Sequence, residues 1–277
     1  MSNKKMLALY SLKYNPFCQE VPISALSASP AIENFCWRIE HQIGEGGFAM
    51  ISGVPGSGKS TALRILVDRL ETMPDVTVGV ITRPQASVCD FYRELGDIFA
   101  VALRPSNRWG GAKALRQKWL NHIEASLFRP VLLIDEAQLM SSAALGELRL
   151  LASADLDSRS ILTVVLAGDD RLVEKLQTDD LLPMASRIRC RLRCDSASAQ
   201  LLRECLRHHL KNAGNPRLIS EGVVSALCEH AMGNYRMLMT MANDLLAAAL
   251  HREAEQIDEK LFFEVFDMKA PSARRKL

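Results

Sequence analysis

The segment Gly53–Val54–Pro55–Gly56–Ser57–Gly58–Lys59–Ser60 has residue types and a spacing suited to binding phosphate groups. It fits the pattern G-x-x-x-x-G-K-[ST], in which glycines let backbone N–H groups turn inward around an anion. The lysine can reach the outer phosphates of a nucleotide, and the final hydroxyl can bind Mg²⁺. Such a match also arises by chance in glycine-rich turns, but an apolar strand before it and an amphipathic helix after it favour a phosphate site. We therefore predict that these residues, together with Thr61, bind ATP and Mg²⁺.

Two adjacent carboxylates, Asp135 and Glu136, follow a second apolar run, Val131–Ile134. The carboxyl end of a strand is where ligands bind in an open α/β sheet. Asp135 is expected to hold Mg²⁺ through water, and Glu136 to orient and polarise the attacking water. The alternative is a helix cap, since acidic residues favour helix N-termini. A carboxylate next to the Mg²⁺ ligand favours hydrolysis over nucleotide binding alone.

An alternation of apolar strands and amphipathic helices surrounds both motifs. The expected strands are continuously apolar, which is typical of parallel strands covered by helices on both faces. They are Phe48–Ser52, Val76–Thr82, Val131–Ile134 and Ile161–Ala167. The expected helices are Thr61–Leu70, 86–101, 112–127 and Ser142–Ala152. Residues Ile188–Cys194 alternate apolar and polar, so we expect a fifth strand nearer an edge of the sheet.

After Asp195 the strand patterns stop, and four helical patterns follow at 196–213, 220–231, 235–251 and 258–267. We therefore expect an N-terminal segment, an α/β core, an all-helical domain and a basic C-terminal tail. Their predicted ranges are 1–45, 46–195, 196–268 and 269–277.

Composition limits the class of protein. Hydrophobic residues make up 48% of the 277 residues, which is enough for a sizeable core and argues against disorder. The net charge of +2 favours no class of partner, so only local clusters of charge are informative. The odd count of seven cysteines, without regular spacing, and the charged N-terminus favour a cytoplasmic protein with free thiols. No stretch is apolar for long enough to predict a membrane span.

Several further motifs, in the same order and spacing, resemble those of AAA+ ATPases of the ExeA type. This group includes transposition ATPases similar to TniB, TnsC and MuB. The motifs are Leu12–Lys13–Tyr14–Asn15–Pro16–Phe17, Gly47–Phe48, Asp135–Glu136–Ala137–Gln138, Leu166–Ala167–Gly168 and Gly233–Asn234–Tyr235–Arg236. The last departs from the family pattern Gly-x-Pro-Arg, because a tyrosine replaces the proline.

The resemblance implies a five-stranded AAA+ P-loop core followed by a small helical lid. It also implies a homo-oligomer, either a ring or a helical filament. ATP would bind between the core and the lid, and at the contact with the next subunit. The resemblance further implies that Asp169 senses the γ-phosphate and that Arg236 is a second sensor carried by the lid. The alternatives are a strand-end cap for Asp169 and an exposed helix arginine for Arg236.

Four arginines alternate with apolar residues from position 187 to 194 and should project from one face of a strand. In the family, an arginine just before the fifth strand reaches the neighbouring subunit's ATP. Arg187 fits this position best and Arg189 second, whereas a solvated strand face explains at least two of the four. The nearby Cys190 and Cys194 do not predict a zinc site, since residues four apart on a strand are about 13 Å from each other.

Two functions remain open from the resemblance. The favoured one is an ATP-dependent regulator of DNA transposition that oligomerises on double-stranded target DNA without strong sequence preference and recruits or activates a transposase, with a target-selection protein as a possible further partner. The alternative is a secretion- or envelope-associated ATPase of the ExeA kind, which usually carries membrane and cell-wall-binding regions. In relatives that encircle DNA, loops facing the pore contact phosphates, and here these contain Arg83, Arg104, Asn107, Arg108 and Lys113. For each basic residue the alternative is an ordinary solvated surface. Trp109, beside Gly110–Gly111, could stack on a base, but a packing residue is the more common role and is what we expect.

Overall fold

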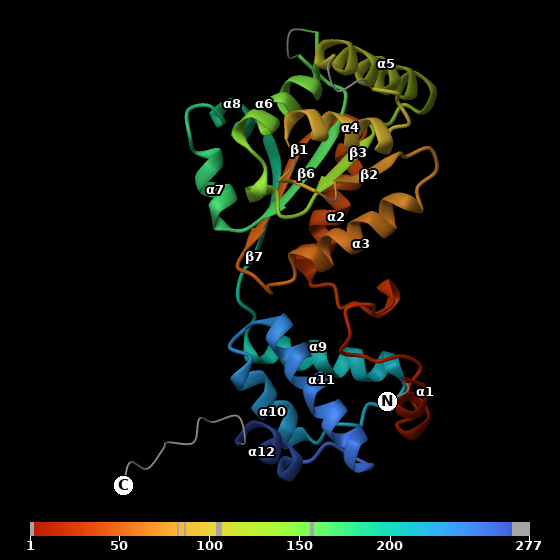
Figure 1. Ribbon diagram of the computed structural model, residues 1–277, viewed down its shortest axis with the longest axis vertical. Coiled ribbons are helices and arrows are strands. Elements are labelled where there is room, and N and C mark those ends of the chain that lie inside the picture. The colour runs from red at the N-terminus through yellow and green to blue at the C-terminus, as the bar shows by residue number, and fades with distance from the viewer. Residues whose placement is uncertain (1–2, 82, 86, 104–106, 156–157, 268–277) are drawn as a thin grey trace. The chain divides into compact units, whose positions relative to one another are not determined.

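The computed structural model describes residues 3–81, 83–85, 87–103, 107–155 and 158–267 (Figure 1). These residues form two compact units. One is Ala28–Cys194, and the other joins the residues up to Ser27 to those from Asp195 onward. The chain therefore changes unit between Ser27 and Ala28, within the segment that the sequence pattern assigned to positions 1–45. The predicted basic tail, 269–277, lies outside the described residues.

The first unit is built on a sheet of five parallel strands among the described residues. Its order is β2 (Val78–Ile81), β3 (Val131–Ile134), β6 (Thr163–Gly168), β1 (Gly47–Gly53) and β7 (Ile188–Cys194). The predicted five-stranded parallel sheet is thus confirmed. The alternating strand β7 lies at an edge, as expected, with one row of side chains buried and the other exposed.

Helices cover both faces of this sheet (Figure 1). Strand residues such as Phe48, Met50 and Leu132 share one apolar cluster with the helices on one face. These helices are α4 (Val88–Ile98), α5 (Arg108–Ser126), α6 (Ser142–Leu151), α7 (Asp170–Leu176) and α8 (Leu182–Ala185). On the other face, α3 (Lys59–Glu71) packs against β1, β2 and β6, and α2 (Pro30–Gln42) packs against β7. The continuous apolar character of the central strands follows from this double coverage.

Several short elements were not predicted from the sequence. They are η2 (Ala137–Leu139), α7, α8 and the antiparallel pair β4 (Ser153–Ala154) and β5 (Arg159–Ser160). Helix α5 also begins four residues before its predicted start, because the side chain of Asn107 caps it by accepting a hydrogen bond from Gly110 N. The two glycines of its first turn resemble a loop in sequence. A Cβ at Gly111 would lie 3.5 Å from Tyr92, so this position brings α5 close to α4.

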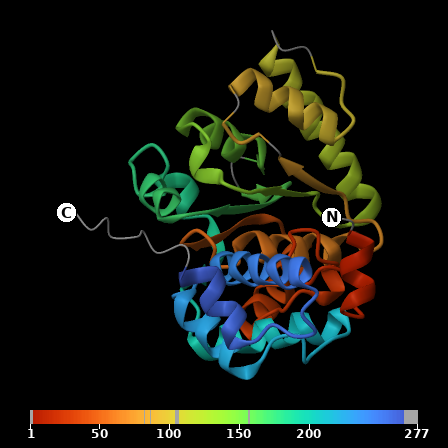
Figure 2. The same ribbon diagram turned by 60° about the horizontal axis from the view of Figure 1, so that its bottom comes forward.

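The second unit is helical (Figure 2). It contains α9 (Ala199–Ala213), α10 (Glu221–His230), α11 (Tyr235–Arg252) and α12 (Glu259–Asp267), with α1 (Asn3–Leu9) and η1 (Ile23–Ala25) from the N-terminal segment. Side chains of Ser198, Ser220 and Asn234 cap the first three of these helices. Among the described residues, none of the helices has both the length and the apolar composition of a membrane span.

The motif Leu12–Phe17 packs into the core of this helical unit. Asn15 Oδ1 accepts a hydrogen bond from Phe17 N at 3.0 Å, which closes a tight turn, and Asn15 Nδ2 donates to Asn243 Oδ1 on α11 at 2.9 Å. The turn presents the carbonyl of Pro16 to His209 Nδ1 on α9 at 3.0 Å. His209 is only 6% exposed, and this burial lowers the pKa of its imidazole.

The lowered pKa of His209 predicts that stability falls in acid. Below about pH 6.5, the imidazole binds a proton in the unfolded chain before it does so in the folded one, so protonation favours unfolding. His209→Asn places an amide donor near the same carbonyl and removes the titration. We expect urea unfolding midpoints at pH 7.5 and pH 5.5 to differ less in this variant than in the wild type. His251→Asn, at an exposed position of α11, is the control and should keep the wild-type difference; an equal pH response in His209→Asn would contradict the prediction.

Candidate nucleotide-binding site

The phosphate loop connects β1 to α3, and its backbone requires glycine at three positions. Gly53, Gly56 and Gly58 have φ angles of 154°, 81° and 100°. At Gly53 a Cβ atom would lie 2.1 Å from the carbonyl oxygen of Cys194, so any side chain would force the loop away from β7. Gly58 is the N-cap of α3, and the loop therefore ends at a helix N-terminus, which favours an anion.

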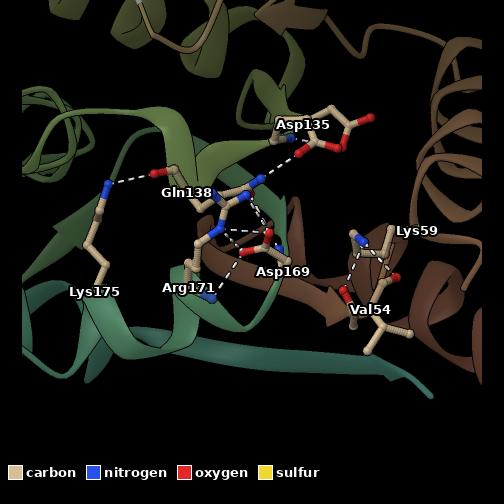
Figure 3. A network of polar contacts seen from close by, with 9 residues as sticks. Val54, Lys59, Asp135, Gln138, Asp169, Arg171 and Lys175 are labelled. Atoms are coloured by element: carbon tan, nitrogen blue, oxygen red, sulfur yellow. Dashed lines mark hydrogen bonds and ion pairs between the residues drawn. The ribbon is translucent and has the colours of Figure 1, made fainter. Parts of the chain in front are cut away.

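Two buried polar groups of this loop fit a phosphate ligand. Lys59 is 6% exposed, and its Nζ donates to the carbonyls of Gly53 at 2.8 Å and Val54 at 3.1 Å (Figure 3). Ser57 is also 6% exposed, and its hydroxyl makes no hydrogen bond to any described residue. A buried hydroxyl without a partner is costly, so a phosphate oxygen accepting its hydrogen would satisfy it.

The two predicted Mg²⁺ ligands are brought together by the fold. Ser60 lies in the first turn of α3, and its Oγ donates to Asp135 Oδ2, after the end of β3, at 2.9 Å. The other carboxylate oxygen of Asp135 accepts from the backbone N–H of Glu136 at 2.9 Å. A hydroxyl and a carboxylate in contact are hard oxygen ligands of the kind that Mg²⁺ prefers, so the residues present fit this ion.

Glu136 has a left-handed backbone, with φ of 52°, and an exposed side chain. Its carboxylate accepts a hydrogen bond from Gln138 Nε2. Gln138 is 5% exposed, and its Oε1 accepts from Asp169 N at 3.4 Å. Lys175 Nζ fixes the same segment by donating to the carbonyl of Gln138 at 2.6 Å (Figure 3). It also donates to the carbonyl of Met140 at 2.7 Å. The amide of Gln138 therefore links the acidic pair to the end of β6, a role that the sequence pattern did not predict.

Asp169 follows β6 and caps α7 by accepting a hydrogen bond from Arg171 N at 3.0 Å. The guanidinium of Arg171 also donates to both of its carboxylate oxygens. These contacts, and the ammonium of Lys59 more weakly, hold the pKa of Asp169 below its ordinary value. The strand-end cap considered for Asp169 is thus present, and the structure adds Arg171, for which the sequence has no motif.

The arginine row differs in one respect from its prediction. Arg189, Arg191 and Arg193 project from the exposed side of β7, but Arg187 precedes the strand and donates through Nη1 to the carbonyl of Pro183. The backbone follows α8 as a turn at this point, so only three of the four arginines share the strand face. Arg189 forms an ion pair with Glu45 at 2.9 Å.

Arg236 belongs to the helical unit, where it is exposed in the first turn of α11. The preceding Gly233 has φ of 81°, and its carbonyl accepts a hydrogen bond from Ala197 N at 2.9 Å. Asn234 then caps the helix. Tyr235 occupies the first helical position, where proline is favoured but not required, so its replacement of proline leaves a regular helix start.

The basic residues considered for DNA contact lie on two elements. Arg83 is exposed after β2, and Arg108 and Lys113 are exposed near the start of α5. Arg108 is therefore helical rather than part of a loop, because Asn107 caps α5 immediately before it. Trp109 is 77% exposed, and Lys113 Nζ lies 5.7 Å from the centre of its ring, so the expectation of a packing residue was wrong. Arg104 lies outside the described residues.

Comparison with known proteins gives both a sequence relative and a family match. Residues 41–176 match the family model described as an AAA domain. The chain is 29% identical over 216 residues to general secretion pathway protein A of Aeromonas hydrophila. This similarity covers 76% of the chain but only 39% of the secretion protein.

Solved structures share the fold at low sequence identity. Cdc6p of Pyrobaculum aerophilum is similar over 87% of this chain and 67% of its own, with a TM-score of 0.67 and 15% identity. Drosophila ORC bound to DNA is similar over 96% of this chain and 66% of the ORC chain, with a TM-score of 0.68 and 18% identity. The RuvB branch migration motor of Thermotoga maritima is similar over 88% of this chain and 70% of the RuvB chain, with a TM-score of 0.60 and 16% identity. Together with the sheet order and the phosphate loop, these similarities show an AAA+ P-loop fold, and residues 41–176 are the part that is similar to the AAA domain family.

Proposed function

We propose that this chain binds and hydrolyses ATP with Mg²⁺, and that it does so as part of a homo-oligomer assembled on double-stranded DNA. The observation that carries the ATPase function is the contact between Ser60 Oγ and Asp135 Oδ2 at 2.9 Å, next to the buried ammonium of Lys59. This arrangement of a hydroxyl, a carboxylate and a buried ammonium supports binding of phosphate and Mg²⁺ at one edge of the sheet.

The proposed roles follow from the chemistry of each side chain. Lys59, Ser57 and the backbone N–H groups of the loop bind the phosphates, while Ser60 and Asp135 hold Mg²⁺, which neutralises phosphate charge when bound. Glu136 orients the attacking water and accepts its proton. The hydrogen bond from Gln138 fixes the direction of the Glu136 carboxylate.

Glu136→Gln should separate hydrolysis from binding. The amide keeps the size and hydrogen-bonding ability of the side chain but is a far weaker base, so we expect turnover to fall about ten-fold or more, or about 1.4 kcal/mol of transition-state stabilisation. Calorimetry should show unchanged affinity for ATP with Mg²⁺. Lys59→Ala is the matched binding-deficient variant. Wild-type turnover in Glu136→Gln, or wild-type nucleotide affinity in Lys59→Ala, would contradict these assignments.

The arginine before β7 motivates a site shared between subunits. An arginine offered by a neighbour would offset charge that develops on the γ-phosphate, and Arg187 is our first candidate for this role, with Arg189 second. Arg236 is proposed as the sensor of the helical unit, and Asp169 as part of the γ-phosphate end of the site.

Mixed oligomers test this sharing. Arg187→Ala subunits retain the phosphate loop, and Lys59→Ala subunits retain the arginine, so a mixture should recover part of the hydrolysis that each variant lacks. A mixture of Lys59→Ala and Glu136→Gln should recover none, because both changes affect the same half of the site. Equal failure of the two mixtures, with co-assembly verified by cross-linking, would argue against Arg187.

DNA transposition is the specific role that we propose, with a transposase and a target-selection protein as candidate partners. Exposed Arg83 after β2, and exposed Arg108 and Lys113 close to Trp109 on α5, support contact with phosphates and bases. Fold relatives with DNA in their descriptions, such as Drosophila ORC bound to DNA, are consistent with this role. The 29% identity to general secretion pathway protein A favours the second candidate, a secretion-associated ATPase without a DNA role.

Nucleotide-dependent DNA binding distinguishes the two candidates. We expect a non-hydrolysable ATP analogue to promote binding to double-stranded DNA of any sequence, and salt to weaken it steeply because each neutralised phosphate releases counterions. Arg83→Ala and Arg108→Ala should weaken all sequences equally and reduce the salt slope by about one each. Arg207→Ala removes an exposed arginine of α9 and serves as the control. Absence of DNA binding in every nucleotide state at low salt would favour the secretion role.

A further inference from the structure

Arg171 lies at the start of α7, next to the acidic residues of the candidate site (Figure 3). Its Nε donates to the two carboxylate oxygens of Asp169 at 2.9 and 3.1 Å, and its Nη2 donates to one of them at 2.7 Å. One edge of the planar guanidinium is thus held by Asp169. Among the described residues, Nη1 has no hydrogen-bond partner, and the side chain is 66% exposed.

The cap of α7 does not require this guanidinium. Asp169 caps the helix through the backbone N–H of Arg171, and that contact would be present with any side chain at this position. Exposed ion pairs contribute little to stability, since solvent screens the charges. Neither the helix cap nor the stability of the fold thus requires the guanidinium of Arg171 at Asp169, so we consider a role in ligand binding.

The charges around the pair indicate what the guanidinium faces. The hydrogen bonds from Arg171, and then the ammonium of Lys59, lower the pKa of Asp169. The carboxylate of Asp169, and more weakly that of Glu136, raise the pKa of Arg171. The pair is thus within electrostatic reach of both the loop lysine and the carboxylate that we assign to the attacking water.

A bare carboxylate at Asp169 would repel the terminal phosphate of ATP, whereas a guanidinium attracts it and matches its oxygens geometrically. We propose that Arg171 contacts the terminal phosphate through its open Nη1 edge, and that Asp169 is a positioning residue that aims the guanidinium. This inference rests on the proposed ATPase function. In this proposal Arg171, and not Asp169, is the residue of the same subunit that contacts the γ-phosphate.

Calorimetric titration with ADP and with a non-hydrolysable ATP analogue, both with Mg²⁺, tests the proposal. Arg171→Ala should bind the analogue about ten-fold more weakly while its affinity for ADP stays within about two-fold of wild type, since only the analogue carries the terminal phosphate. Asp169→Asn keeps a capping oxygen but releases the guanidinium, so it should lose part of the same preference. The double variant should lose no more than Arg171→Ala alone, because the two residues act as one unit.

Arg93→Ala is the matched control, because it removes the arginine of a similar exposed pair, Arg93–Asp90 at 2.7 Å, at the start of α4. Arg171→Gln, checked for a wild-type thermal midpoint, guards against a folding defect and should behave as Arg171→Ala. Equal weakening of ADP and analogue, or an unchanged ratio, would overturn the role of Arg171 while leaving the ATPase intact. If the wild type binds neither nucleotide, the proposed function itself fails, and the role of Arg171 with it.

Discussion

The parallel pairing of β1, β6 and β3 is the constraint on which the candidate site depends. Ser52 lies opposite Gly168, and Ile134 opposite Leu166, so the three strands end at the same edge of the sheet. The chain that leaves each strand enters the site: the phosphate loop after β1, Asp135 after β3 and Asp169 after β6. A shift of one residue in either pairing would turn the side chains at these ends to the opposite face of the sheet.

Close packing at this edge of the sheet restricts position 168 to glycine. A Cβ at Gly168 would lie 2.7 Å from Gln138 Oε1 and 2.8 Å from Leu172, so glycine there admits the buried amide. The amide in turn joins Glu136 to the backbone of Asp169. A substitution at Gly168 would therefore disturb the predicted catalytic carboxylate without touching it directly.

Positively and negatively charged side chains lie close to one another at the same edge of the sheet. The charges of Lys59 and Arg171 act on the carboxylate of Asp169, and the carboxylate of Glu136 acts on Arg171. Lys59 is buried, so solvent screens its charge less than it screens the exposed charges of Glu136 and Arg171. Gln138 fixes the carboxylate of Glu136, and Asp169 pairs with the guanidinium of Arg171, so these two contacts set the positions of the charged groups at this edge.

The sequence by itself determined the fold class, the order of the strands along the chain and the two motifs of the site. Glycine spacing, continuous apolar runs and alternating burial are local properties of the chain, and each has one simple structural solution. The edge position of β7 followed in the same way from its alternating pattern.

Only the tertiary structure decided which side chains meet. Gln138 and Arg171 have no local signal of a role, because their importance comes from partners on other strands and helices. The packing of Leu12–Phe17 with the helical unit, across some two hundred positions of sequence, is equally non-local. The early start of α5 and the exposure of Trp109 were misjudged from sequence for a related reason. A side-chain cap from Asn107 and a close approach at Gly111 outweigh the weak helix propensity of glycine, and they orient the first turn of α5 so that its tryptophan faces solvent.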